Sequence, residues 1–94
     1  MGTVKQIYNT QLVRRVKEAR KQAGLSQQEV AERLTLEVVN YNRFEVDEPL
    51  PHYLIEAFCR LTNIPIDLLI TGRDPRRFYD NPIAAIRPAK NVGK

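Results

Sequence analysis

Residues 26–45 read SQQEVAERLTLEVVNYNRFE, and this stretch decides the fold because it predicts two short helices joined by a tight turn. Ser26 can cap the first helix, at residues 27–34, and Glu29 completes a capping box three residues later. The second helix is expected at residues 38–45. The first carries one apolar stripe at helical spacing, formed by Val30, Ala31 and Leu34.

GLSQQEVAERL, followed by L-x-x-x-x-Y-x-x-F-E, resembles the helix-turn-helix of the phage-repressor and Cro family. The similarity continues upstream into RRVKEARKQAGLS and downstream into LIEAFCRLTNIPIDLLITG, so that it covers residues 12–72. The resemblance implies a sequence-specific DNA-binding transcriptional regulator whose partner is double-stranded DNA. Members place the second motif helix in the major groove, and their dimers bind the half-sites of a palindromic operator about one DNA turn apart.

The resemblance also implies which side chains face DNA. Glutamines at the start of the first motif helix donate to phosphates, whereas valine contacts a thymine methyl group and arginine pairs with guanine. Asparagine can reach adenine or phosphate, and a glutamate can accept from a cytosine amino group. The implied DNA-binding residues are Gln27, Gln28, Glu37, Val38, Val39, Asn40, Asn42 and Arg43.

Three further positions gain a meaning from the family. Arg20 aligns with an arginine that pairs with the glutamate at Glu45, which predicts a buried structural salt bridge; two unrelated exposed charges are the alternative. Thr35 stands where glycine is usual at the turn. A β-branched residue there either accepts strain of about 1–2 kcal/mol or adopts a different turn geometry.

The charges of the chain are unevenly distributed. The net charge is +4, but residues 35–71 carry two basic side chains against six acidic ones, and this block contains the second motif helix. Family members commonly place a glycine and a basic residue after that helix, where this chain has Asp47 and Glu48. A second interpretation therefore stays open: a protein-interaction module that keeps the helix-turn-helix fold and binds DNA weakly or without specificity.

The periodic stretches predict an all-α fold: a compact five-helix domain at residues 10–72 with a C-terminal extension at residues 73–94. Residues 1–9 are expected to form a loose lead-in, with Asn9 or Thr10 capping the first helix and Gly24 ending it. The helices are expected at residues 10–23, 27–34, 38–45, 51–62 and 66–70.

The extension is basic and aromatic, and three roles stay open for it: a nucleic-acid contact, an anchor on its own domain or on a partner subunit, and a flexible tail. Together with the last helix it holds more apolar residues than one small core needs. We therefore expect a homodimer, with possible contacts from Leu68, Ile70, Phe78, Tyr79, Ile83 and Ile86.

Several classes of protein receive no support from the sequence. A single cysteine excludes an intramolecular disulfide, and no Cys/His cluster has the spacing of metal ligands. We find no paired carboxylates, glycine-rich phosphate loop or nucleophile with a base, so neither a catalytic residue nor a cofactor is expected. Cys59 is predicted to be a small core residue. Short apolar runs and the absence of a recognisable signal peptide predict a soluble, cytoplasmic protein.

Overall fold

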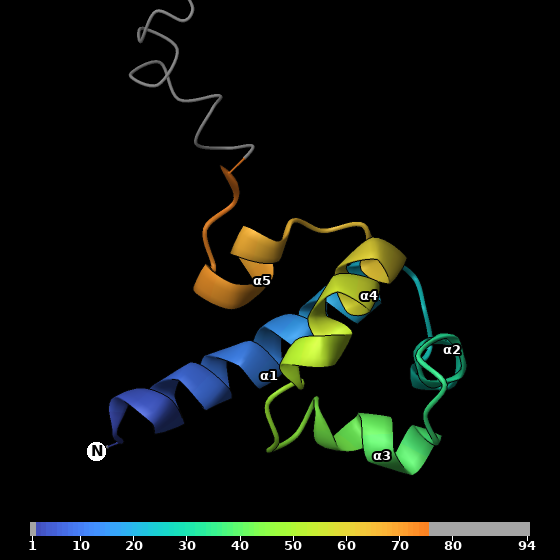
Figure 1. Cartoon of the computed structure of the whole chain (residues 1–94), viewed down its shortest axis with the longest axis horizontal. Coiled ribbons are helices and arrows are strands. Elements are labelled where there is room, and N and C mark those ends of the chain that lie inside the picture. Colours follow the sequence, from blue (N-terminus) through green and yellow to red (C-terminus); the bar gives the residue numbers. More distant parts are fainter. Residues whose placement is uncertain (1, 76–94) are drawn as a thin grey trace, which may run out of the picture.

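Five helices and no strand make up residues 2–75, the part of the chain that the computed structural model describes (Figure 1). This confirms the all-α prediction. None of these helices is long and apolar enough to cross a membrane. The helices are α1 (Val4–Gln22), α2 (Gln27–Arg33), α3 (Val38–Arg43), α4 (His52–Thr62) and α5 (Ile66–Thr71).

The start of α1 differs most from the prediction. The lead-in expected at residues 1–9 is wrong for residues 4–9, because α1 begins at Val4, and Asn9 and Thr10 lie inside it. The hydroxyl of Thr3 accepts from the backbone amide of Gln6 at 3.2 Å. The side-chain oxygen of Gln6 accepts in return from the amide of Thr3 at 2.8 Å, which completes a capping box.

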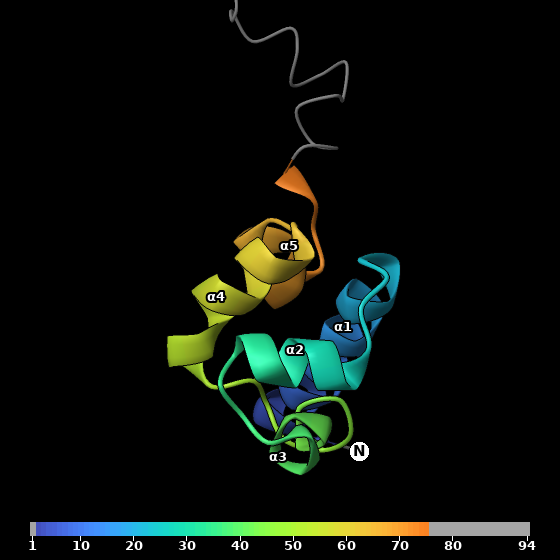
Figure 2. The ribbon, with the colours of Figure 1, turned by 90° about the vertical axis from the view of Figure 1, so that its right-hand side faces the viewer.

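The helix-turn-helix consists of α2 and α3, which lie side by side in both views (Figures 1 and 2). Ser26 and Glu29 form the expected capping box at the start of α2. Thr35 takes the left-handed conformation that glycine usually supplies, with φ at +61°, so the turn keeps its geometry and the threonine carries the strain.

The second motif helix is shorter than residues 38–45, because α3 ends at Arg43 and Phe44 is its C-cap. Three successive backbone amides, from residues 46–48, turn back to the carbonyl oxygen of Arg43 at 2.9–3.1 Å. This tight turn leads the chain from α3 into the connection to α4.

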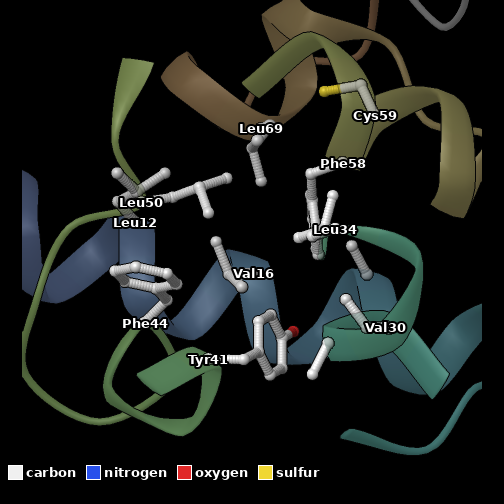
Figure 3. Packing of buried hydrophobic residues seen from close by; sticks show 12 residues of the cluster. Leu12, Val16, Val30, Leu34, Tyr41, Phe44, Leu50, Phe58, Cys59 and Leu69 are labelled. Carbon is white, nitrogen blue, oxygen red and sulfur yellow. The ribbon is translucent and has the colours of Figure 1, made fainter. Parts of the chain in front are cut away.

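One hydrophobic core joins all five helices (Figure 3). Tyr41 of α3 points toward Val30 of α2 and Val16 of α1, and all three are fully buried. Cys59 is also buried, as predicted. The largest fully buried side chains are Tyr41, Phe58, Leu12, Leu69, Val16 and Val30.

Arg15 connects α1 to the end of α5. Its Nε donates to the carbonyl of Leu69 at 2.6 Å, and its Nη2 donates to the carbonyl of Ile70 at 2.9 Å. These are two of the carbonyl groups that the last turn of a helix leaves without an intrahelical partner. The side chain of Arg15 is therefore partly buried against α5.

Candidate nucleic-acid interface

The outer side of α3 is exposed along its length. Val39 is 59% exposed, and Glu37, Val38, Asn40 and Arg43 are exposed as well. The inner side is fixed by Tyr41 in the core and by Phe44, whose ring meets that of Tyr41 edge to face at 6.3 Å. A short helix held in this way presents a rigid outer surface.

Gln28 lies exposed in the first turn of α2 and donates from its side-chain nitrogen to Glu32 at 3.1 Å. Beside it, the backbone amide and hydroxyl of Ser26 hydrogen-bond to the carboxylate of Glu29 and lower the pKa of that group. This turn is therefore ordered by its own capping residues.

Gln27 and Asn42 do not lie on the open surface with the other predicted DNA-binding residues. Both are half-buried between α2 and α3. Asn42 donates to the side-chain oxygen of Gln27 at 3.2 Å, and the nitrogen of Gln27 donates to Glu45 at 2.9 Å. Their side chains therefore connect the two motif helices to each other and to the residue that follows α3.

Arg20 and Glu45 lie together, as the resemblance implied. Nε and Nη2 of Arg20 donate to the two carboxylate oxygens of Glu45 at 2.6 and 3.1 Å, and Nη1 donates to the carbonyl of Leu25 at 2.9 Å. The side chain of Glu45 is 1% exposed and that of Arg20 is 13% exposed. The pair thus ties α1 to the end of α3.

Tyr41 adds a contact that the sequence did not reveal, because its hydroxyl donates to the carboxylate of Glu45. Burial and this hydrogen bond together raise the pKa of Tyr41. Burial alone would also raise the pKa of Glu45, but hydrogen bonds from Arg20, Tyr41 and Gln27 outweigh it and hold that pKa below its ordinary value. Glu45 is therefore a buried carboxylate that four donor groups keep ionised.

The exposed charges around α3 are mainly acidic. Arg43 is the one Lys or Arg in residues 34–59 of the sequence, whereas Glu37, Asp47 and Glu48 are exposed on the same stretch. Phosphate contacts supply most of the non-specific affinity of a DNA-binding protein. An interface built on α3 would therefore depend on its side chains at base edges more than on phosphate attraction.

Two of the six residues predicted for a dimer contact, Leu68 and Ile70, lie in the described part of the chain. Leu68 and Ile70 are half-buried on α5, while Leu69 between them points into the core. Phe78, Tyr79, Ile83 and Ile86 lie outside the described residues. Within residues 2–75, no group of three or more His, Cys, Asp or Glu side chains could hold a metal ion.

A protein-family model described as a helix-turn-helix domain matches residues 11–69. The match covers more than half of the 94 residues, so the chain belongs to this helix-turn-helix family. The family indicates a DNA-binding regulator with DNA as its partner. Comparison with curated proteins and with solved structures gives no match.

Proposed function

We propose that the chain is a sequence-specific transcriptional regulator of the phage-repressor and Cro type, acting in the cytoplasm and binding a palindromic operator as a homodimer. The observation that carries this proposal is the two-sided character of α3. Its inner side is locked by Tyr41 and by the contacts of Glu45, and its outer side is free. A rigid helix with an exposed outer face suits insertion into the major groove.

The outer side chains of α3 then read base edges. Arg43 pairs with a guanine, and Val38 and Val39 lie against thymine methyl groups. Asn40 contacts adenine or phosphate, and Glu37 accepts from a cytosine amino group. Gln28 contacts phosphate, while Gln27 and Asn42 act from behind by holding α3 against α2.

Dimerisation follows from the operator geometry that this family reads, because two half-sites one helical turn apart need two copies of the motif. Support on the molecule comes from Leu68 and Ile70, which α5 leaves half-buried beside its inward-pointing Leu69. The apolar residues of the C-terminal extension enter this proposal on the sequence alone.

A second function, protein interaction without specific DNA binding, is favoured by one observation. Val38 and Val39 are exposed next to Glu37, and Val46 beyond the end of α3 is 62% exposed. An apolar and acidic surface of this kind suits a protein partner better than a phosphate backbone.

Replacing Arg43 with alanine tests the first proposal. Loss of a bidentate contact to guanine should cost about 1–3 kcal/mol of specific affinity and relax the preference at one base pair. Arg60→Ala is the matched control, because Arg60 is an exposed arginine on α4, outside the motif. Competition binding against a selected operator measures both variants. Equal effects of Arg43→Ala and Arg60→Ala would contradict the assignment of Arg43.

A further inference from the structure

A chain of hydrogen bonds through three side chains leads from the buried end of α3 toward its outer side. Glu45 accepts from the side-chain nitrogen of Gln27 at 2.9 Å, and the side-chain oxygen of Gln27 accepts from Nδ2 of Asn42 at 3.2 Å. The side chain of Glu45 is 1% exposed, whereas Gln27 and Asn42 are half-buried. The chain of hydrogen bonds therefore begins in the core and ends at the surface of the motif.

Glu45 sets the direction of every hydrogen bond in this chain. Its carboxylate is ionised and can only accept, so the nitrogen of Gln27 has to face it. The oxygen of Gln27 then faces Asn42, and only the nitrogen of Asn42 can donate to that oxygen. Turning over the amide of Asn42 alone would bring two acceptor oxygens together. Turning over both amides would set the oxygen of Gln27 against the carboxylate.

The side-chain oxygen of Asn42 is the group that this arrangement leaves without a donor among residues 2–75. The one hydrogen bond of this amide within that range leads from its nitrogen to Gln27 on α2, so its oxygen faces away from α2. Asn42 follows Val38 by four residues and Val39 by three, and both valines are exposed on the outer side of α3. The half-buried amide therefore presents an acceptor oxygen beside the two valines.

We infer that Asn42 is a specificity-determining residue whose oxygen accepts from a base amino group in the major groove, and that Gln27 is the positioning residue that fixes its amide. The inference rests on the proposed reading of DNA by α3. Adenine and cytosine carry an amino group at the major-groove edge, whereas guanine and thymine present a carbonyl oxygen there. Adenine fits best, because its N7 can also accept from the second N–H of the same amide.

The two ends of the amide thus have separate roles. The nitrogen of Asn42 holds α3 against α2 through Gln27, and the oxygen selects the base. A phosphate is a poorer partner for this oxygen, because phosphate oxygens accept hydrogen bonds as well. Arg43, the next residue of α3, offers donors only and suits guanine. Neighbouring residues of α3 therefore select opposite kinds of base edge.

Hydrogen exchange of the side-chain amide of Asn42, followed by NMR in the free protein, tests the positioning contact. Gln27→Met removes both polar atoms of the chain while keeping the length of the side chain and a good helix former. Gln22→Met is the matched control, since Gln22 is an exposed glutamine at the end of α1. Exchange at Nδ2 of Asn42 should become roughly fivefold faster in Gln27→Met and stay unchanged in Gln22→Met. Equal exchange in the wild type and Gln27→Met would overturn the role of Gln27, whether or not the chain binds DNA.

Competition binding on the operator that the wild type selects tests the reading of the base. Asn42→Ala identifies the base pair, because the preference for adenine over guanine should fall about tenfold at one position. Gln27→Met should relax the preference at the same position and leave the guanine read by Arg43 as it is. The Gln22→Met chain should keep both preferences, and thermal unfolding checks that each variant is folded.

Three results would count against the inference, and they differ from one another. If Gln27→Met weakens binding to all sequences equally, Gln27 does not position Asn42, although the chain still reads DNA. If the position that Asn42→Ala relaxes prefers guanine or thymine in the wild type, the nitrogen of Asn42 faces the base and the assignment of its oxygen is wrong. If the folded wild type selects no sequence at all, the proposed function fails and the base-reading role of Asn42 fails with it.

Discussion

Replacing Glu45 with glutamine removes one negative charge and almost no volume. In the folded chain this carboxylate accepts from Nε and Nη2 of Arg20, from the side chain of Gln27 and from the hydroxyl of Tyr41. A glutamine offers one acceptor oxygen and places a donor where a second acceptor stood. The variant therefore leaves the guanidinium of Arg20 without its ionic partner and faces at least one donor with another donor.

The burial of the Arg20–Glu45 pair sets how much unfolding free energy the Glu45→Gln variant should lose. Breaking one side of a buried ion pair costs about 3–5 kcal/mol, because the remaining charge stays desolvated. Arg20 is 13% exposed and can recover some hydration, so the lower end, about 3 kcal/mol, applies. For a domain of this size that loss should lower the melting temperature by roughly 15 °C.

Thermal and urea unfolding, followed by circular dichroism, measure the loss. The chain supplies its own control in a second Arg–Glu pair, Arg60 with Glu56, at 2.7 Å on the surface of α4. Both partners are mostly exposed, so Glu56→Gln should change stability little. If the two variants unfold at the same temperature, the Arg20–Glu45 pair does not stabilise the fold in the way the geometry suggests.

The stabilisation by Glu45 should also depend on pH, in a direction that the pKa of its carboxylate sets. The pKa of Glu45 in the folded chain lies below its ordinary value, so the unfolded chain binds the proton more readily. The contribution of the carboxylate is then complete above about pH 4.5 and is lost as the pH falls through the folded pKa. The difference in unfolding free energy between the wild type and Glu45→Gln should therefore shrink at acid pH. A difference that grows on acidification would refute the reasoning.

Three more experiments test separate parts of the fold. Thr35→Gly should raise the free energy of unfolding by about 1 kcal/mol, because φ of Thr35 is +61°. Asn63→Gly, where φ is +59°, should raise it less, since asparagine tolerates this region, and equal gains in urea unfolding would contradict this. Arg15→Ala should speed amide exchange in α5 roughly tenfold, whereas Arg14→Ala, at an exposed neighbour, should not. Cys59 is buried, and burial raises the pKa of its thiol, so alkylation in native buffer should be far slower than in denaturant.

Local signals in the sequence were sufficient for the helix-turn-helix. The capping box of Ser26 and Glu29 starts α2 where predicted, and the stripe of Val30, Ala31 and Leu34 is buried, as its helical spacing indicated. The first turns of α1 were missed, although Thr3 and Gln6 carry the same kind of capping signal. Residues 1–9 carry no periodic apolar stripe long enough to mark a helix. The structure gives the reason, because Val4, Ile7 and Tyr8 are exposed and cover no core among residues 2–75.

The inward contacts of the candidate site could not be predicted from local pattern. Whether Asn42 points to solvent or to Gln27 depends on the rotation of α3 about its axis, which the core around Tyr41 sets. Likewise, the bonds from Arg15 to α5 join residues more than fifty positions apart. Such contacts depend on tertiary packing, whereas helix caps and apolar stripes depend on residues that are close together in the sequence.

Selection of bound sequences from a random pool of duplex DNA, at low salt, tests the central proposal most directly. We predict that the folded chain enriches a palindromic sequence with half-sites about one helical turn apart. Arg43→Ala should enrich the same motif with one guanine position relaxed in each half-site. If the folded wild type enriches no sequence and binds every duplex with the same affinity, the proposal of a sequence-specific regulator is wrong.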